Sequence, residues 1–202
     1  MISDILEKFR AKILKFLPIP EEECKAYFRS DMKVKHLKAK GFFIKEGEIS
    51  HEMAFVSKGV LRMFYNSPEG KEINTRFFFE NDFVVAYQSF LLQKPGRYFI
   101  QALDDCELIT VPHNNLQNAF EQSHIWNKFG RIVAEKSFIL AEQRTEDLLF
   151  YNAEERYQKL LKTHPKIFEQ IPLYHIASYL GIERESLSRL RKKLSRSNTI
   201  VT

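Results

Sequence analysis

The sequence has few residues of the kind that staple small scaffolds or bind metals. It contains two cysteines, Cys24 and Cys106, in 202 residues. Two thiols are too few for a disulfide framework, a structural zinc site or a cysteine-ligated iron–sulfur cluster. We interpret them as buried or unreactive thiols in a reducing compartment.

Long hydrophobic runs are also missing. No apolar stretch approaches the roughly 20 residues that a membrane-spanning helix needs. The first residues, "MISDILEKFRAKILKF", are charged throughout and lack the apolar centre of a secretory signal. Their apolar residues recur at helical spacing, which predicts an amphipathic helix packed on the body of the protein. We therefore expect a cytoplasmic protein without a membrane partner.

Glycine and proline, seven of each, are unevenly placed. From about residue 32 to residue 112 they separate short stretches rich in Phe, Tyr, Val and Ile, such as "EMAFVSKGVLRMFYN" and "KEINTRFFFE". Strands at regular spacing, without helices between them, are typical of an antiparallel sandwich or jelly roll.

Between residues 114 and 164 the pattern changes, because Gly130 is the only glycine and proline is absent. The apolar residues there recur at helical spacing and predict one long amphipathic helix. Its stripe packs either on its own domain or against a second copy. We favour a dimer, because the helix is longer than the surface that one small domain offers. The predicted dimer residues are Trp126, Phe129, Ile132, Val133, Ile139 and Leu140.

Positive charge is concentrated near the C-terminus. Residues 171–202 hold six Lys and Arg against two Glu, so this segment carries +4 of the net +5 of the chain. A local basic excess of this kind indicates an anionic partner, most often nucleic acid.

The segment "IPLYHIASYLGIERESLSRLRKKL" predicts two short helices joined at Gly181. Pro172 suits the first turn of a helix, and Gly181 suits a tight turn between crossing helices. On a helical wheel of about 100° per residue, Leu187, Leu190 and Leu194 fall on one side of the second helix. The opposite side holds the residues predicted to contact DNA bases, Arg184, Glu185, Ser188 and Arg189. Phosphate contacts are predicted for Arg191, Lys192, Lys193 and Arg196.

A solvated amphipathic helix would show the same charges. The apolar residues at positions 176, 180, 182, 187 and 190, with Ala177 and Gly181 between them, match the helix-turn-helix template and favour double-stranded DNA as the partner.

The chain as a whole resembles the Crp/Fnr family of transcription regulators, over about residues 25–196. "FIKEGEISHEMAFVSKGVLRMF" and "SPEGKE" are similar to the strands and hairpin turn of the family's cyclic-nucleotide-binding β-roll. "LFYNAEERYQKLL" resembles its hinge and the first helix of its DNA domain. The resemblance implies a homodimer on a near-palindromic operator, and it allows a contact with RNA polymerase. It places Arg184, Glu185 and Arg189 at the family's base-reading positions.

The sequence departs from the family where a cyclic nucleotide would bind. Val85-Ala86 stands in place of a Gly-Glu pair that accepts from the ribose, and Tyr98 follows Arg97 where Ser or Thr is expected. We therefore expect an effector other than cAMP. The predicted effector pocket is Tyr87, Gln88, Arg97 and Tyr98, whereas Arg97 could equally be an exposed loop residue.

The sequence thus predicts an α+β protein. Residues 1–112 form an N-terminal helix and an antiparallel β-roll, 113–150 a dimerisation helix, and 151–202 a helix-turn-helix domain. The predicted function is a non-enzymatic, homodimeric DNA-binding regulator with no cofactor and an unidentified small-molecule effector. Two alternatives stay open: a ligand-independent DNA-binding protein whose β-roll serves only dimerisation or protein contacts, and a cupin-like metal enzyme, for which His51-Glu52 offers a single His.

Overall fold

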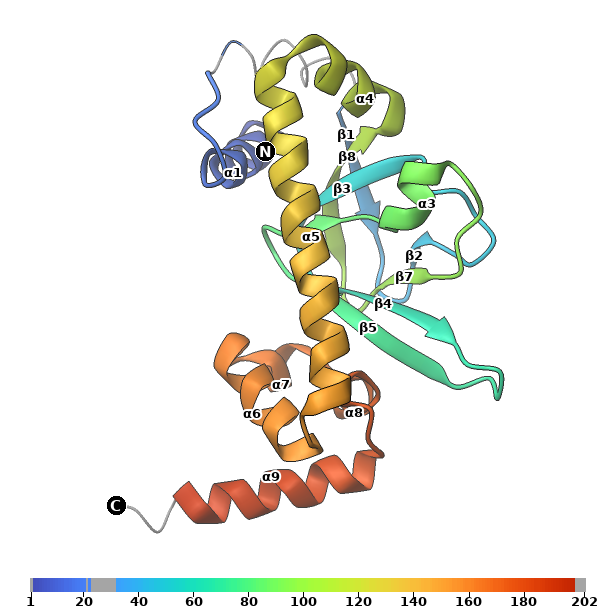
Figure 1. Ribbon diagram of the computed structural model, residues 1–202, viewed down its shortest axis with the longest axis vertical. Coiled ribbons are helices and arrows are strands. Elements are labelled where there is room, and N and C mark those ends of the chain that lie inside the picture. Colours follow the sequence, from blue (N-terminus) through green and yellow to red (C-terminus); the bar gives the residue numbers. More distant parts are fainter. Residues whose placement is uncertain (1, 21, 23–31, 199–202) are drawn as a thin grey trace. The chain divides into compact units, whose positions relative to one another are not determined.

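The computed structural model describes residues 2–20, 22 and 32–198 (Figure 1). The chain folds into two compact units. Unit 1 comprises Met1–Tyr65 and Phe77–Phe138, and unit 2 comprises Asn66–Arg76 and Ile139–Thr202. The predicted domain boundaries are at residues 112 and 150. The two units instead divide between residues 138 and 139, and residues 66–76 belong to unit 2.

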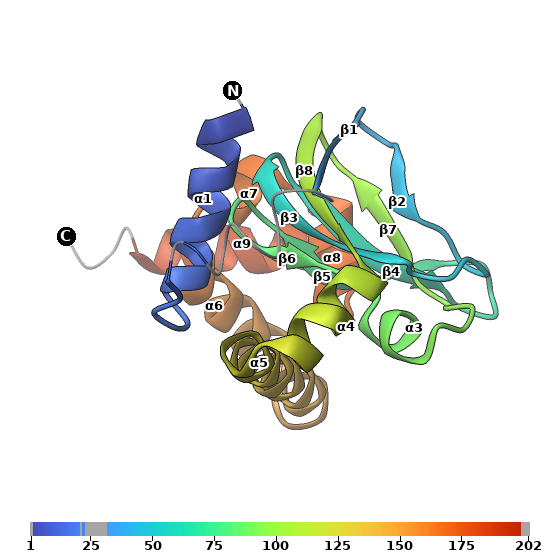
Figure 2. The same cartoon turned by 90° about the horizontal axis from the view of Figure 1, so that it is seen from above.

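Eight strands form two four-stranded sheets (Figures 1 and 2). The first sheet has the order β1-β8-β3-β6 and the second has the order β2-β7-β4-β5. The strands are β1 (Lys33–Leu37), β2 (Phe42–Ile44), β3 (Glu52–Lys58), β4 (Leu61–Asn66), β5 (Glu72–Phe78), β6 (Phe83–Val84), β7 (Phe99–Ala102) and β8 (Cys106–Pro112). The pairs β1–β8, β3–β8, β3–β6, β2–β7 and β4–β7 are all antiparallel. The predicted β-roll is therefore confirmed.

The first sheet is buried on both faces, as β3 illustrates. Successive side chains of a strand point to opposite faces. Met53 and Phe55 belong to one hydrophobic cluster, and Ala54 and Val56 belong to another. The second cluster fills the space between the sheets and also contains Leu61, Phe78, Val84, Ala86 and Ile100. The continuous apolar run "MAFV" in the sequence follows from this double burial.

Among the described residues, four helices belong wholly or partly to unit 1: α1 (Ile2–Leu14), α3 (Tyr87–Leu92), α4 (His113–Gln122) and the first part of α5 (His124–Phe150). The predicted N-terminal helix is present, and its Phe9 and Ile13 are buried against the outer face of the first sheet. Trp126 and Phe129 of α5 and Leu116 of α4 lie in the same cluster. None of the helices in the described part of the chain is long and apolar enough to cross a bilayer.

Unit 2 contains the rest of α5, then α6 (Ala153–Thr163), α7 (Ile167–Gln170), α8 (Leu173–Leu180) and α9 (Arg184–Asn198). The break before α6 follows from its cap. The Asn152 side chain accepts from the backbone N–H of Glu155, and the Glu155 carboxylate accepts from the backbone N–H of Asn152. This capping box satisfies two amides at the helix start.

Cys106 is a buried free thiol at the start of β8. Burial, followed by the nearby Asp104 carboxylate, raises the pKa of the Cys106 thiol to about 12. The group is thus a neutral, unreactive thiol at physiological pH, as predicted. Cys24 lies outside the described residues.

Candidate nucleic-acid interface

Helices α8 and α9 are joined by a tight turn at Gly181. Gly181 has φ 67° and ψ 35°, a left-handed conformation that costs glycine little. Its N–H donates to the carbonyls of Ala177 and Ser178, and the N–H of Ile182 donates to Ala177. Pro172 occupies the N-cap position of α8. The predicted positions of both the turn and the helix start are therefore correct.

Two arginines from neighbouring helices bind the C-terminal end of α8. Arg144 of α5 donates to the carbonyl of Tyr179 and stacks its guanidinium 4.0 Å from the Tyr179 ring centroid. Arg156 of α6 donates through Nε to the carbonyl of Leu180 at 3.0 Å. The last carbonyls of a helix lack intrahelical partners and carry partial negative charge, so cations are favourable there. These contacts fix the position from which α9 leaves the turn.

Helix α9 has one packed side and one polar side. Leu187 has no exposed surface, and the inner face of α8 opposite it is formed by Ile176, Ala177 and Leu180, all buried. Arg184, Glu185 and Arg189 are exposed, and Ser188 is partly buried. Arg189 Nη2 lies 3.2 Å from Ser186 Oγ on the same helix. The predicted base-reading residues thus share the outer side of one helix, accessible to a partner.

The predicted phosphate-binding residues have different environments. The Arg191 guanidinium lies 4.4 Å from the centroid of the Phe168 ring, so it packs toward α7. Lys193 forms an ion pair of 2.7 Å with Glu154 of α6. Lys192 is exposed, and the Arg196 side chain lies outside the described ones. Arg191 and Lys193 therefore also hold α9 against its neighbours, which the helical wheel did not predict.

A groove of about 670 Å³ runs beside α9. It is lined by Tyr157, Gln158, Leu161, Ser188, Arg191, Lys192 and Leu194. Helix α9 continues to Asn198.

The tip of the β4–β5 hairpin contacts α8 within unit 2. Ser178 Oγ donates to the carbonyl of Glu72 at 2.8 Å and accepts from the N–H of Asn74 at 3.0 Å. The Asn74 side chain lies 3.3 Å from His175 Nδ1, and both side chains are buried. Sequence analysis missed these contacts. Their only signal was a histidine and a serine on a short, otherwise apolar helix.

The four predicted effector residues do not gather around a described cavity. Tyr87 begins α3 and is half-buried, and this burial raises the pKa of its phenol. Tyr98 packs edge-on against Tyr65 at 6.2 Å between ring centroids. Gln88 and Arg97 are exposed. One cavity in the β-roll is lined by other residues, namely Phe43, Ile44, Ile49, Ser50, His51, Glu52 and Pro112.

The predicted dimer residues on α5 fall into two groups. Trp126 is fully buried and Phe129 is 3% exposed, both in the hydrophobic cluster of their own chain. Their assignment to a dimer interface is therefore wrong. Ile132 and Val133 are half-buried, whereas Ile139 and Leu140 are exposed. Phe138, Leu148, Leu149 and Phe150 are further exposed apolar residues of α5.

Comparisons with known proteins agree with this architecture. Residues 34–123 match the family model of the cyclic nucleotide-binding domain. No curated protein matches the sequence significantly.

Solved structures match most of the chain. FixK2 from Bradyrhizobium japonicum is 18% identical, with a TM-score of 0.73 over 83% of this chain and 86% of its own. The catabolite activator protein of Thermus thermophilus is 18% identical, with a TM-score of 0.57 over 93% and 88%. A protein from Eubacterium rectale, described as a regulator of the Crp/Fnr family, is also 18% identical, with a TM-score of 0.66 over 91% and 88%. Residues 34–123 are therefore similar to the cyclic nucleotide-binding domain, and the chain has the fold of solved structures that are described as transcription regulators, one of them of the Crp/Fnr family.

Proposed function

We propose that this protein is a homodimeric, sequence-specific DNA-binding transcription regulator without enzymatic activity. Its partner is a near-palindromic duplex, read in the major groove by α9 of each subunit. Its β-roll senses a small molecule other than cAMP. Operator-bound protein would contact RNA polymerase where it activates a promoter.

The geometry of α9 is the observation that carries this proposal. Its apolar side is anchored by Leu187 on α8, and its polar side presents Arg184, Glu185 and Arg189 to solvent. Arginine pairs bidentately with the O6 and N7 atoms of guanine, and glutamate accepts from the N4 amino group of cytosine. A helix held in this way inserts its N-terminal residues into a major groove.

Selection of random duplex DNA on the purified protein tests the proposal. A dimer that reads two successive major grooves is expected to enrich a two-fold-symmetric site, with half-sites about 34 Å apart. Enrichment of no sequence, or of a single asymmetric half-site, would contradict it.

Arg189→Ala is expected to weaken binding to the selected site by about 1–3 kcal/mol and to relax the preference at one base step. Lys192→Ala is the control for charge, because phosphate contacts weaken all duplexes alike and lower the salt dependence of binding. Fluorescence anisotropy on the selected site and on single-base variants separates the two effects. If both variants lost the same affinity for all duplexes, Arg189 would not contact a base.

The exposed apolar residues of α5 support a dimer. Phe138 is 64% exposed, Leu149 71% and Phe150 75%. Phe138 and Leu149 are eleven residues apart, about three helical turns, and so lie on nearly the same side of the helix. Several large exposed apolar residues on one helix are typical of a protein–protein interface.

Leu149→Glu is therefore expected to weaken dimerisation by about a hundredfold or more, because two-fold symmetry places the buried charge in the interface twice. Analytical ultracentrifugation across a concentration series measures the dissociation constant. Leu91→Glu, on the 53% exposed Leu91 of α3, is the matched control and should sediment like the wild type. Equal sedimentation of both variants would place the dimer interface elsewhere.

The interior of the β-roll argues against a cyclic nucleotide as the effector. Ala86 replaces the expected ribose-binding glutamate, and its side chain is buried in the cluster between the sheets. The apolar packing around Ala86 also favours the ligand-independent alternative. Operator affinity is therefore measured with and without cAMP. A change above twofold would contradict both an effector other than cAMP and ligand-independent DNA binding.

A further inference from the structure

A cleft on the β-roll, distinct from the region of Tyr87, Gln88, Arg97 and Tyr98, has the composition of a small-molecule site. Its volume is about 290 Å³. That is at the lower end of the volumes of ligand pockets, which suits a molecule smaller than a nucleotide. Phe43 and Ile44 contribute from the second sheet, and Glu52 and Pro112 from the first. The cleft therefore opens between the two sheets.

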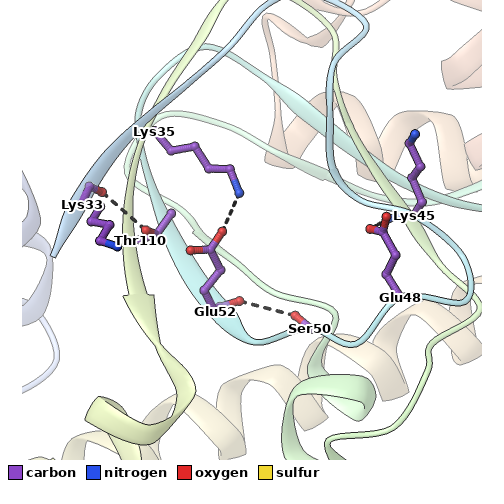
Figure 3. Close-up of polar contacts among 7 residues, drawn as sticks. All are labelled: Lys33, Lys35, Lys45, Glu48, Ser50, Glu52 and Thr110. Carbon is purple, nitrogen blue, oxygen red and sulfur yellow. Dashed lines mark hydrogen bonds and ion pairs between the residues drawn. The ribbon is translucent and has the colours of Figure 1, made fainter. Parts of the chain in front are cut away.

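An ion pair joins Glu52, which lines the cleft, to Lys35, which lies next to the lining residues (Figure 3). Lys35 Nζ of β1 is 2.6 Å from Glu52 Oε1 of β3, with side-chain exposures of 39% and 30%. Lys35 Nζ also lies 5.1 Å from the centroid of the Phe43 ring. Both groups keep capacity for further contacts. An ammonium has three donors, and the second carboxylate oxygen of Glu52 has no hydrogen-bond partner among the described residues.

Four of the seven residues that line the cleft are apolar, and the other three are Ser50, His51 and Glu52. Phe43 and Ile44 are 8% and 5% exposed, and Ile49 and Pro112 complete the surface. A ligand with an apolar body would gain burial on these walls. A ligand with a single charge would attract one member of the Lys35–Glu52 pair and repel the other. A zwitterion satisfies both, with its carboxylate on Lys35 and its ammonium on Glu52.

We infer that this cleft binds a free α-amino acid with an apolar side chain, through the Lys35–Glu52 pair and the Phe43–Ile49–Pro112 wall. The ion pair is partly exposed, so it contributes little to folding stability and is available to bind a ligand. The regulatory consequence of this site rests on the proposed function, whereas binding itself does not.

The same segment anchors helix α3. The N–H of Ser50 donates to Ser89 Oγ at 3.0 Å, and Gln93 Nε2 donates to the carbonyl of Ser50 at 3.2 Å. His51 Nδ1 lies 3.0 Å from Gln93 Oε1. An occupant of the cleft therefore contacts residues 50–52, which hold the helix that carries Tyr87 and Gln88. A ligand can shift an equilibrium of the protein only through such differential contacts.

Isothermal titration calorimetry of the full-length protein with L-leucine, without DNA, tests the site. 4-Methylpentanoate and isoamylamine, which are leucine without its amino group and without its carboxyl group, each lack one of the two charges and are expected to bind at least about tenfold more weakly than leucine. Lys35→Gln and Glu52→Gln should each weaken leucine binding by a similar factor. Ile49→Trp, which fills the cleft and leaves both charges, should abolish binding. Thermal denaturation of each variant confirms that it folds.

The matched controls are Lys38→Gln and Asp105→Asn. They disrupt another ion pair of the same unit, with 2.8 Å between Lys38 Nζ and Asp105 Oδ2, and should leave leucine affinity within about twofold. No heat of binding at millimolar leucine would overturn the inference. Equal affinity in wild type, Glu52→Gln and Ile49→Trp would overturn it as well.

Repeating the DNA titration with leucine separates this inference from the proposed function. A change in operator affinity above twofold, lost in Glu52→Gln, supports a regulatory site. Leucine binding without any change in operator affinity overturns the regulatory role and leaves the site. Specific DNA binding without leucine binding overturns the site and leaves the proposed function.

Discussion

Replacing Arg184 and Arg189 together with alanine is expected to remove about 2–6 kcal/mol of the preference for the operator over random DNA, since each bidentate contact with a base contributes about 1–3 kcal/mol. The two residues lie on the exposed side of α9 and make no contribution to its packed side, which Leu187 anchors. Loss of both should therefore leave the domain folded. Residual binding should be weak, similar for all sequences and strongly dependent on salt.

Competition binding with operator and scrambled duplexes at two salt concentrations measures this change. The control is Lys94→Ala combined with Arg131→Ala. It removes the same charge from exposed positions of unit 1, where Arg131 pairs with Glu135 at 2.6 Å. The control should keep the full preference for the operator. If the control lost as much specificity as the α9 variant, net charge and not base contact would explain the effect.

The helix-turn-helix could be predicted because its determinants are local. Gly181 must adopt a positive φ to turn the chain, and leucines three and four residues apart must share one side of α9. The β-roll was predictable for the same reason, since turn residues separate short apolar strands along the chain. Both patterns depend on neighbours within about one or two helical turns or one hairpin.

The remaining features depend on contacts between distant segments. Arg144 and Arg156 bind the end of α8 from two other helices, and the Asn74–His175 contact joins residues that are 101 positions apart. The spacing of residues along the sequence does not show which distant residues are in contact. A helical wheel likewise shows that a stripe is apolar, but it does not show which partner covers it. For this reason Trp126 and Phe129 were assigned to a dimer, although they fill the core of their own chain.

Because Trp126 lies in the core of its own chain, Trp126→Ala is expected to lower the free energy of unfolding. Trp126 is fully buried and meets Phe129 edge-on at 5.6 Å between ring centroids, within the cluster that joins α1, the first sheet and α5. Truncation of a buried tryptophan removes its burial and leaves a cavity. The free energy of unfolding is therefore expected to fall by about 3–5 kcal/mol. Leu91→Ala, on the exposed surface of α3, should change it by less than about 0.5 kcal/mol.

Urea denaturation of wild type and variants at one fixed protein concentration measures the loss, because dimerisation makes apparent stability concentration-dependent. Analytical ultracentrifugation under native conditions gives the dimer dissociation constant of the same samples. Truncation of a core residue lowers the unfolding free energy and leaves the dissociation constant of the folded dimer unchanged. Leu149→Glu instead raises the dissociation constant, and it lowers the apparent stability only by the contribution of the lost dimer. The opposite result is a weaker dimer with a free energy of unfolding within about 1 kcal/mol of the wild type, far below the cost of truncating a buried tryptophan. That result would place Trp126 in the dimer interface.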